Sequence, residues 1–105
     1  MNSNIGRTIP ADHPSLPGHF PGQPIVPGVV ILDEVSAALR NWRADCQVTV
    51  IRLVKFLVPL KPEQPFTISL SSGTAADEID FSCRAEDRLI MQGRLEVVCT
   101  DPLTI

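Results

Sequence analysis

Apolar residues recur at helical spacing between Val29 and Trp42. Ile31, Val35, Ala38 and Trp42 follow one another at intervals of three or four positions, and no Pro or Gly interrupts the segment. The first two turns are also apolar on their other sides, which is typical of a helix that other elements surround. The pattern therefore predicts a central helix over 29–42.

Four segments after this helix have the apolar patterns of strands. Residues 47–58 are rich in β-branched side chains and apolar on both faces, whereas 66–71, 79–83 and 89–97 alternate apolar and polar positions. Short connectors separate the last three segments and permit hairpins, which favours an antiparallel sheet. With a brief strand at 5–9, we expect all 105 residues to form a single α+β domain, in which an antiparallel β-sheet wraps around one central α-helix.

Prolines crowd the segment before the helix. Six of the ten prolines lie between Pro10 and Pro27, a density that excludes both a helix and a strand ladder. Phe20, Ile25 and Val26 are apolar anchors within this segment, and long irregular segments of a small domain often carry function. We therefore expect an ordered, rigid loop with a functional role.

The charge and length of the chain exclude several classes of protein. The net charge is −3 and no Lys/Arg cluster is present, which argues against binding to nucleic acid or to an anionic membrane. No apolar run approaches the roughly 20 residues that span a bilayer, and Met1-Asn2-Ser3-Asn4 lacks the features of a signal peptide. We expect a cytoplasmic protein. Because a domain this small buries a modest share of its surface, we also expect an oligomer.

Neither the cysteines nor the histidines have the spacing of a metal site. Cys46, Cys83 and Cys99 form no Cys-x-x-Cys pattern and are expected to be small core residues. His13 lies six residues before His19, and no third ligand stands near the pair. The sequence therefore predicts a protein that needs neither a metal nor another cofactor.

His19 in the loop and Asp33 in the helix are the candidate catalytic pair. Asp is a poor helix-interior residue, and an ionisable group on an apolar helix costs free energy unless it is paired or neutralised. Purely structural interpretations are also open, because His19 could bond loop carbonyls and Asp33 could accept N–H bonds of the first turn. Glu34 is an alternative acid. Consecutive helical residues point about 100° apart, so Asp33 and Glu34 cannot both face one site, and these arguments leave the choice open.

The start of the helix offers a third chemical group. Gly28 and Val29 follow Pro27 directly, so their backbone N–H groups lie at the positive end of the helix dipole and can bind an oxyanion. A base, an acid and an oxyanion donor are the groups that elimination next to a thioester carbonyl requires. The combination favours an enzyme that acts on acyl thioesters.

One segment resembles the active-site segment of the 3-hydroxyacyl-acyl-carrier-protein dehydratases, hot-dog enzymes of bacterial fatty-acid synthesis. It reads Gly18-His-Phe-Pro-Gly-Gln-Pro-Ile-Val-Pro-Gly28 and continues as Val-Val-Ile-Leu-Asp33. That family carries an Asp or Glu fourteen residues after the His, which matches Asp33 rather than Glu34. Weaker similarity continues to the last predicted strand. Two features depart from the family: the region before the loop is shorter than in typical members, and Ala37 stands where a Gln is usual.

The resemblance implies a hot-dog fold and the dehydration of a (3R)-hydroxyacyl thioester to a trans-2-enoyl thioester, in fatty-acid or related lipid and polyene biosynthesis. The substrate would be carried on acyl carrier protein or coenzyme A. His19 would be the general base, Asp33 would protonate the leaving hydroxyl or hold the departing water, and Gly28, with Val29, would polarise the thioester carbonyl.

The resemblance also implies a homodimer, or a higher oligomer of dimers. In such a dimer, His19 and Asp33 of one site come from different subunits. Two other functions remain open. One is a hot-dog thioesterase in which Asp33 or Glu34 activates water, and the other is a non-catalytic acyl-binding subunit.

Overall fold

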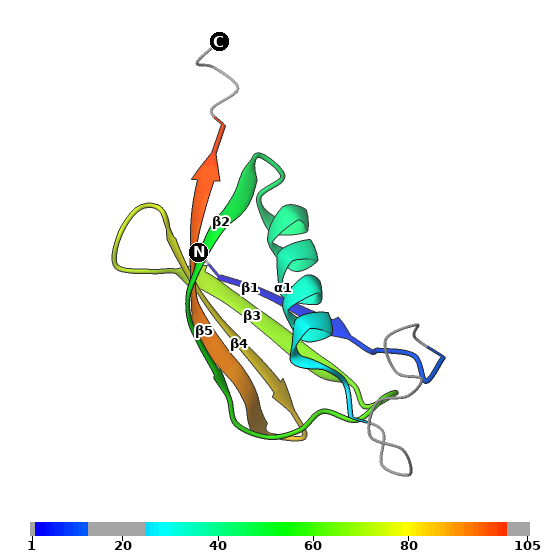
Figure 1. The fold of residues 1–105 in the computed structure, drawn as a ribbon. Helices are drawn as coiled ribbons and strands as arrows, with labels where there is room; N and C mark the ends of the chain where they lie inside the picture. Colours follow the sequence, from blue (N-terminus) through cyan, green and yellow to red (C-terminus); the bar gives the residue numbers. More distant parts are fainter. Residues whose placement is uncertain (1, 13–24, 101–105) are drawn as a thin grey trace.

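The computed structural model describes residues 2–12 and 25–100, which form one helix and a five-stranded antiparallel sheet (Figure 1). Every element that the apolar pattern predicts is present, which confirms the α+β class, although the first strand starts at Asn2 rather than at residue 5. Most of the predicted rigid loop, from 13 to 24, lies outside the described residues. In chain order the elements are β1 (Asn2–Arg7), α1 (Gly28–Trp42), β2 (Cys46–Phe56), β3 (Phe66–Ser72), β4 (Glu78–Ala85) and β5 (Arg88–Cys99).

The strands lie in the order β1-β3-β4-β5-β2, and all neighbours are antiparallel. The hairpin between β4 and β5 turns at Glu86 and Asp87, whose φ angles of 51° and 63° are left-handed, as a two-residue hairpin turn requires. Strand β2 directly follows the helix in the chain, but its neighbour in the sheet is β5, from which β3 and β4 separate it in sequence. As a result, β1 and β2 are the two edges of the described sheet.

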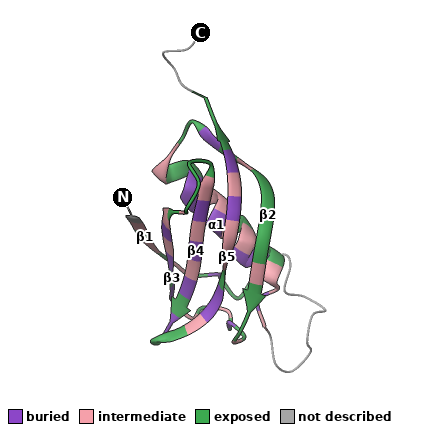
Figure 2. Cartoon of the chain, turned by 90° about the vertical axis from the view of Figure 1, so that its left-hand side faces the viewer, coloured by how far each residue is buried: buried purple, intermediate pink, exposed green. Residues whose placement is uncertain are grey.

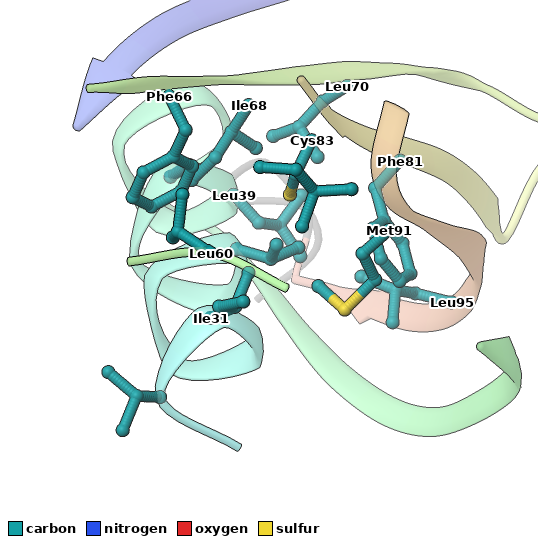
Figure 3. Close-up of a cluster of buried hydrophobic side chains, with 14 of the residues drawn as sticks. Ile31, Leu39, Leu60, Phe66, Ile68, Leu70, Phe81, Cys83, Met91 and Leu95 are labelled. Carbon is teal, nitrogen blue, oxygen red and sulfur yellow. The ribbon is translucent and has the colours of Figure 1, made fainter. Parts of the chain in front are cut away.

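One side of α1 packs against one face of the sheet. Figure 3 shows Ile31 and Leu39 of the helix among buried side chains of β3, β4 and β5. Alternate residues of these strands are buried, for example Ile68 and Leu70 in β3, and Figure 2 shows the alternation along the strands. Leu60, between β2 and β3, belongs to the same cluster. Because burying one such aliphatic side chain stabilises the fold by about 1.5–3 kcal/mol, this cluster holds the helix on the sheet.

The opposite side of α1 is exposed within the described part of the chain. Val29 is 64% exposed, and Asp33 and Arg40, which share its side of the helix, are exposed as well. Val30 and Ile31 in the same two turns are buried, so the helix is central to the core and exposed along one stripe. The physical reason is that one sheet covers one stripe of a helix, and the helix has more apolar positions than that stripe holds.

Strand β2 is an edge strand with exposed apolar side chains. Val50, Ile51, Leu53 and Phe56 are 42%, 49%, 53% and 59% exposed, and within the described residues β2 pairs with β5 alone. The sequence predicts apolar residues on both faces of this strand, and the structure leaves both faces largely uncovered. A long apolar edge presents unpaired N–H and C=O groups to any further strand. The edge therefore has the character of an interface.

Two of the three cysteines form a disulfide. Cys46 at the start of β2 is bonded to Cys99 at the end of β5, and the two residues are partners in the strand register. The prediction of small core residues is confirmed for Cys83, which is free and fully buried, but is wrong for Cys99, which is exposed and cross-linked. The pairing joins residues 53 positions apart, and only the strand order brings them together.

Gly93 in β5 occupies a position where the sheet has no room for a side chain. A Cβ there would overlap the carbonyl oxygen of Leu53 and lie 2.7 Å from the ring of Phe81. We expect Gly93→Ala to lower the free energy of unfolding by about 3 kcal/mol, because overpacking forces the backbone to shift. Urea unfolding followed by circular dichroism measures this loss.

Gly6→Ala is the matched control for this substitution. Gly6 also lies in a strand, but a Cβ there would meet no atom within 4 Å. We expect its free energy of unfolding to stay within about 0.5 kcal/mol of the wild-type value. Equal losses in the two variants would contradict the steric explanation.

Candidate active site

Four of the five candidate site residues lie in the first two turns of α1. Gly28 and Val29 are the first residues of the helix, and Asp33 and Glu34 lie in its second turn. His19 falls within 13–24, outside the described residues, so its place relative to the helix stays a prediction. The structure therefore tests what the helix contributes to the site.

The start of α1 presents backbone donors. Pro27 is the N-cap residue and makes no side-chain cap, while its carbonyl accepts hydrogen bonds from the N–H groups of Val30 and Ile31 at 3.0 and 3.4 Å. Within the described part of the chain, the N–H groups of Gly28 and Val29 donate to no backbone carbonyl. The first N–H groups of any helix lack an intrahelical partner, and Pro has no side-chain acceptor to offer them. The two donors and the helix dipole together favour a negatively charged oxygen at this point.

The ring of Phe56 lies over Gly28. It comes from the last residue of β2 and occupies the space that a side chain at position 28 would need, since a Cβ there would be 2.7 Å from the ring Cζ. The ring is nevertheless 59% exposed. Glycine thus lets an aromatic ring of the edge strand approach the helix backbone closely.

An apolar cavity of about 390 Å³ adjoins the helix start. Its walls come from the segment before α1, from the helix, from the end of β2 with its connection to β3, and from β5. The lining residues are Ile25, Val26, Pro27, Gly28, Ile31, Phe56, Leu57, Val58, Pro59, Leu60 and Ile90. Apolar walls beside a few polar groups are typical of sites for small molecules. The cavity suits an aliphatic group whose polar end lies near the helix start.

Asp33 is exposed and points away from the sheet, because the buried Ile31 and Val35 lie on the opposite side of the helix. Further along α1, Arg40 lines a cavity with the first residues of β2. The described part of the chain therefore leaves the Asp33 carboxylate open to solvent.

Glu34 is paired with β1. Its Oε2 lies 3.5 Å from Nε of Arg7, and both side chains are about two-thirds buried. A partly exposed ion pair contributes at most about 1 kcal/mol, so its importance here is positional. Glu34 is engaged on the β1 side of the helix, whereas Asp33 is exposed and points away from the sheet. The structure thus separates the two carboxylates that sequence reasoning alone left unranked.

Groups with shifted pKa values lie elsewhere, on β4, β5 and the turn between β3 and β4. A hydrogen bond of 2.7 Å from Nε of Arg94 to Asp80 raises the pKa of Arg94. Hydrogen bonds from the Thr74 hydroxyl and the Ala75 N–H lower the pKa of Glu78. None of these residues lines the cavity at the helix start. They stabilise the surface of the sheet and its turn.

Metal binding and membrane insertion find no support in residues 2–12 and 25–100. No three His, Cys, Asp or Glu side chains in these ranges lie close enough together to hold a metal ion. No helix in them is long and apolar enough to cross a membrane.

Two residues of the site have weak signals in the sequence. The pairing of Arg7 with Glu34 depends on how α1 crosses β1, which residue spacing does not give. Phe56 is predicted only as a core or interface residue, and its contact with the helix depends on where the edge strand ends. The one available hint is Gly28 itself, because a glycine at a helix start permits close approach of another group.

The chain resembles known dehydratases in sequence. Residues 2–94 match the family model of the ApeI-like proteins, described as ApeI dehydratase. Over 73 residues the chain is 34% identical to the 3-hydroxyacyl-[acyl-carrier-protein] dehydratase FabZ of Chlamydia trachomatis serovar L2. This match covers 59% of the chain and 47% of the relative, so the chain spans about half the length of the curated relatives that it matches.

Solved structures agree with the fold. A chain of the dehydratase heterocomplex ApeI:P from Xenorhabdus doucetiae superposes with a TM-score of 0.81 and 25% identity, covering 94% of this chain and 88% of that one. The Staphylococcus aureus acyl-CoA hydrolase superposes with a TM-score of 0.74, covering 97% of this chain and 66% of that one, and at 15% identity it bears on the fold alone. These similarities confirm the predicted hot-dog fold.

The contact between Gly28 and Phe56 is testable by a double-mutant cycle. We expect Gly28→Ala to lower the free energy of unfolding by about 1–3 kcal/mol, because the new methyl group overlaps the ring. In a Phe56→Ala background the ring is gone, and we expect Gly28→Ala to cost less than about 0.5 kcal/mol. Urea unfolding of the four proteins gives both values. The same cost in the two backgrounds would show that the ring is not what requires glycine.

Proposed function

Because the chain belongs to the ApeI-like dehydratase family, we propose that it catalyses the reversible dehydration of a (3R)-hydroxyacyl thioester carried on acyl carrier protein. The observation that carries the proposal is the separation of the two carboxylates. Glu34 is paired with Arg7, whereas Asp33 is exposed and points away from the sheet. The similarity to a FabZ dehydratase supports the same reaction.

In the proposed reaction, His19 removes a proton from C2 of the acyl chain. The electron pair moves onto the thioester oxygen, which the N–H groups of Gly28 and Val29 stabilise. When this enolate collapses, the C2–C3 double bond forms, the C3–O bond breaks, and Asp33 gives the departing hydroxyl a proton so that water leaves. Exchange with solvent returns the proton from His19 and restores the one on Asp33. The product is a trans-2-enoyl thioester.

The acyl chain is proposed to lie in the apolar cavity at the helix start. Ile31, Phe56 and Ile90 are among its walls, and the N–H group of Gly28 lies at its border. This arrangement would put the thioester carbonyl at the positive end of the helix dipole and the aliphatic part against apolar side chains.

We infer that the complete site forms between two copies of the chain. Asp33 is exposed, and so are the apolar side chains of the edge strand β2. A second copy that adds its own β2 to this edge would cover these side chains and supply backbone partners. As in the resembling dehydratases, His19 would then reach Asp33 from the partner. The alternative binding partner at this edge is a related but different chain, as the name of the ApeI:P heterocomplex illustrates.

Two exposed lysines suit an acidic carrier protein. Lys55 lies in β2 and Lys61 in the connection that follows, both on the surface and near the end of the strand that borders the proposed site. Cations at the entrance of a site raise the rate at which an acidic partner associates. This placement supports a carrier-bound substrate.

The reaction is tested by the absorbance of the conjugated enoyl thioester when the purified chain meets crotonyl or 3-hydroxybutyryl thioesters. We expect Asp33→Asn and His19→Ala each to lower the rate by about 100-fold or more, because each removes a proton-transfer group. Glu34→Gln is the matched control, because it changes the neighbouring carboxylate, which is engaged with Arg7. We expect its rate to stay within a few-fold of wild type.

Other outcomes of this assay would overturn the dehydratase proposal. Release of free thiol without an enoyl product would identify a thioesterase. Binding of the acyl thioester without turnover in the wild type, and with turnover only when a related chain is added, would identify a non-catalytic subunit of a heterocomplex. If Glu34→Gln lost activity while Asp33→Asn kept it, the acid would be Glu34 rather than Asp33.

The shared site is tested by mixing two inactive variants, His19→Ala and Asp33→Asn, after co-refolding. In a twofold-symmetric dimer with shared sites, half of the dimers are mixed and one of their two sites is intact, so we expect about a quarter of the wild-type activity. Sites built within one chain would give no recovery.

A charge placed on the edge strand provides the control for this mixing experiment. Adding Ile51→Lys to both variants should abolish the recovery, because it puts a charge into the apolar edge of β2. Asn4→Lys adds the same charge to β1, the opposite edge, and should leave the recovery unchanged. Sedimentation velocity of the same proteins reports whether Ile51→Lys has produced a monomer.

A further inference from the structure

The start of β2 and the end of β5 form a two-stranded ribbon that extends beyond the rest of the sheet. Pairing between β4 and β5 ends at Glu78 and Glu96, whereas β5 continues to Cys99. Past Glu96 the register partners of β5 lie in β2, and one further hydrogen bond of 2.8 Å joins the N–H of Val97 to the carbonyl of Asp77. Figure 1 and Figure 2 both show these two strand ends beyond β3 and β4. A two-stranded ribbon is marginally stable on its own.

The β2–β5 ladder has two irregularities, and the first of them separates this ribbon from the rest of the ladder. The register shifts between Val48 and Val50, so Cys46, Gln47 and Val48 form a short block of three pairs at the start of β2. Beyond the block, one backbone hydrogen bond of 2.9 Å joins the N–H of Thr100 to the carbonyl of Asp45. The block is therefore short and set apart from the longer part of the ladder.

The disulfide closes this block at its outer end. Cys46 and Cys99 are the last register pair, and the bond fixes the two strand ends together. Cys46 is 2% exposed, whereas Cys99 is exposed. A sulfur atom at the exposed end of a ribbon is accessible to a small thiol, which disulfide exchange requires.

We propose that Cys46 and Cys99 are a redox modification site, at which a reversible cross-link determines whether the start of β2 is ordered. In the oxidised chain, the bond holds the three-pair block in the ladder. In the reduced chain, the block opens locally, while the core strands β3 and β4 stay intact. The first residues of β2 are then no longer an ordered part of the sheet edge.

The exchange involves a low-molecular-weight disulfide such as oxidised glutathione. The thiolate of Cys99 attacks one sulfur of the glutathione disulfide, forms a mixed disulfide and releases one glutathione thiolate. The thiolate of Cys46 then attacks the sulfur of Cys99, forms the Cys46–Cys99 bond and releases the second glutathione. The two cysteines lose two protons and two electrons, and one glutathione disulfide becomes two thiols. Two reduced glutathione molecules reverse the steps.

Cys83 takes no part in this chemistry. It lies fully buried in β4, and burial raises the pKa of its thiol to about 12, which keeps it protonated and unreactive. It therefore serves as an internal reference for the other two cysteines.

Opening of the block would also affect the helix. Ser36, Leu39 and Arg40 line a cavity with the first residues of β2. The cross-link would thus influence the surface at which a second chain is proposed to bind. The inference itself does not rest on the dehydratase activity, because thiol state and strand order are measured without substrate.

The test starts with the whole chain in glutathione buffers that range from reducing to oxidising. Denaturation and alkylation with N-ethylmaleimide should add three labels to the reduced chain and one label, at Cys83, to the oxidised chain, as mass spectrometry reads out. Persistence of the bond in excess reduced glutathione, or its absence in excess glutathione disulfide, would overturn the proposed reversibility.

Hydrogen exchange of the two forms then tests the ordering of the strand. We expect amides at 46–48 and 98–99 to exchange at least about tenfold faster in the reduced chain, because the cross-link no longer holds the two strand ends together. Amides of β3 and β4 should exchange equally in both forms. Equal rates at 46–48 in the two forms would show that the bond does not control the order of this strand end.

Cysteine variants separate the cross-link from general effects of the buffer. The double variant Cys46→Ser/Cys99→Ser should exchange fast at 46–48 in both buffers, and Cys83→Ala should keep the full response. A response that persists in the double variant would overturn the assignment. Hydrogen exchange of the reduced and oxidised wild-type chains also compares the open and cross-linked states. The test therefore does not require the double variant to fold.

Discussion

The structure depends on the packing of one side of α1 against one face of the sheet. Ile31 and Leu39 meet the inner side chains of β3, β4 and β5, and this contact fixes the direction of the helix across the strands. Once the direction is fixed, Glu34 faces β1 and Asp33 points away from the sheet. The helix start is also brought under the end of β2, where Phe56 reaches Gly28. The geometry of the candidate site is thus a consequence of how the core is packed.

The same contact leaves apolar side chains of the helix and of β2 exposed to solvent. Val29 on the helix and Val50, Ile51 and Leu53 on β2 stay exposed, because the sheet has one inner face and the helix needs only one stripe to fill it. Apolar exposure of this kind is costly in water and marks surfaces that meet another chain. Gly28 and Asp33, to which we assign the chemistry, belong to the same helix as Val29, so the proposed reaction and the proposed association would depend on one element.

The elements of the fold follow from local patterns, and their arrangement does not. Helical spacing over 29–42 and the alternation in β3, β4 and β5 identify these elements because burial of one face imposes a period on the sequence. The pairing of β2 with β5, and with it the disulfide between Cys46 and Cys99, has no local signature. For the site, the sequence indicates Asp33 through a motif. The engagement of Glu34 with Arg7 needs the crossing of α1 over β1, which only the folded chain provides.

The position of β2 at the edge has a consequence for the order in which the chain is completed. A ribosome makes β2 before β3, β4 and β5, yet among the described strands β2 finds its neighbour only in β5. During synthesis the apolar strand β2 stays unpaired while the β3–β4 and β4–β5 hairpins form. Its pairing with β5 is a long-range contact, which forms slowly compared with a hairpin. A surface built on the edge of β2 does not exist on a nascent chain that lacks β5. Subunits that meet through this edge therefore assemble after that strand has emerged, from chains that have already folded.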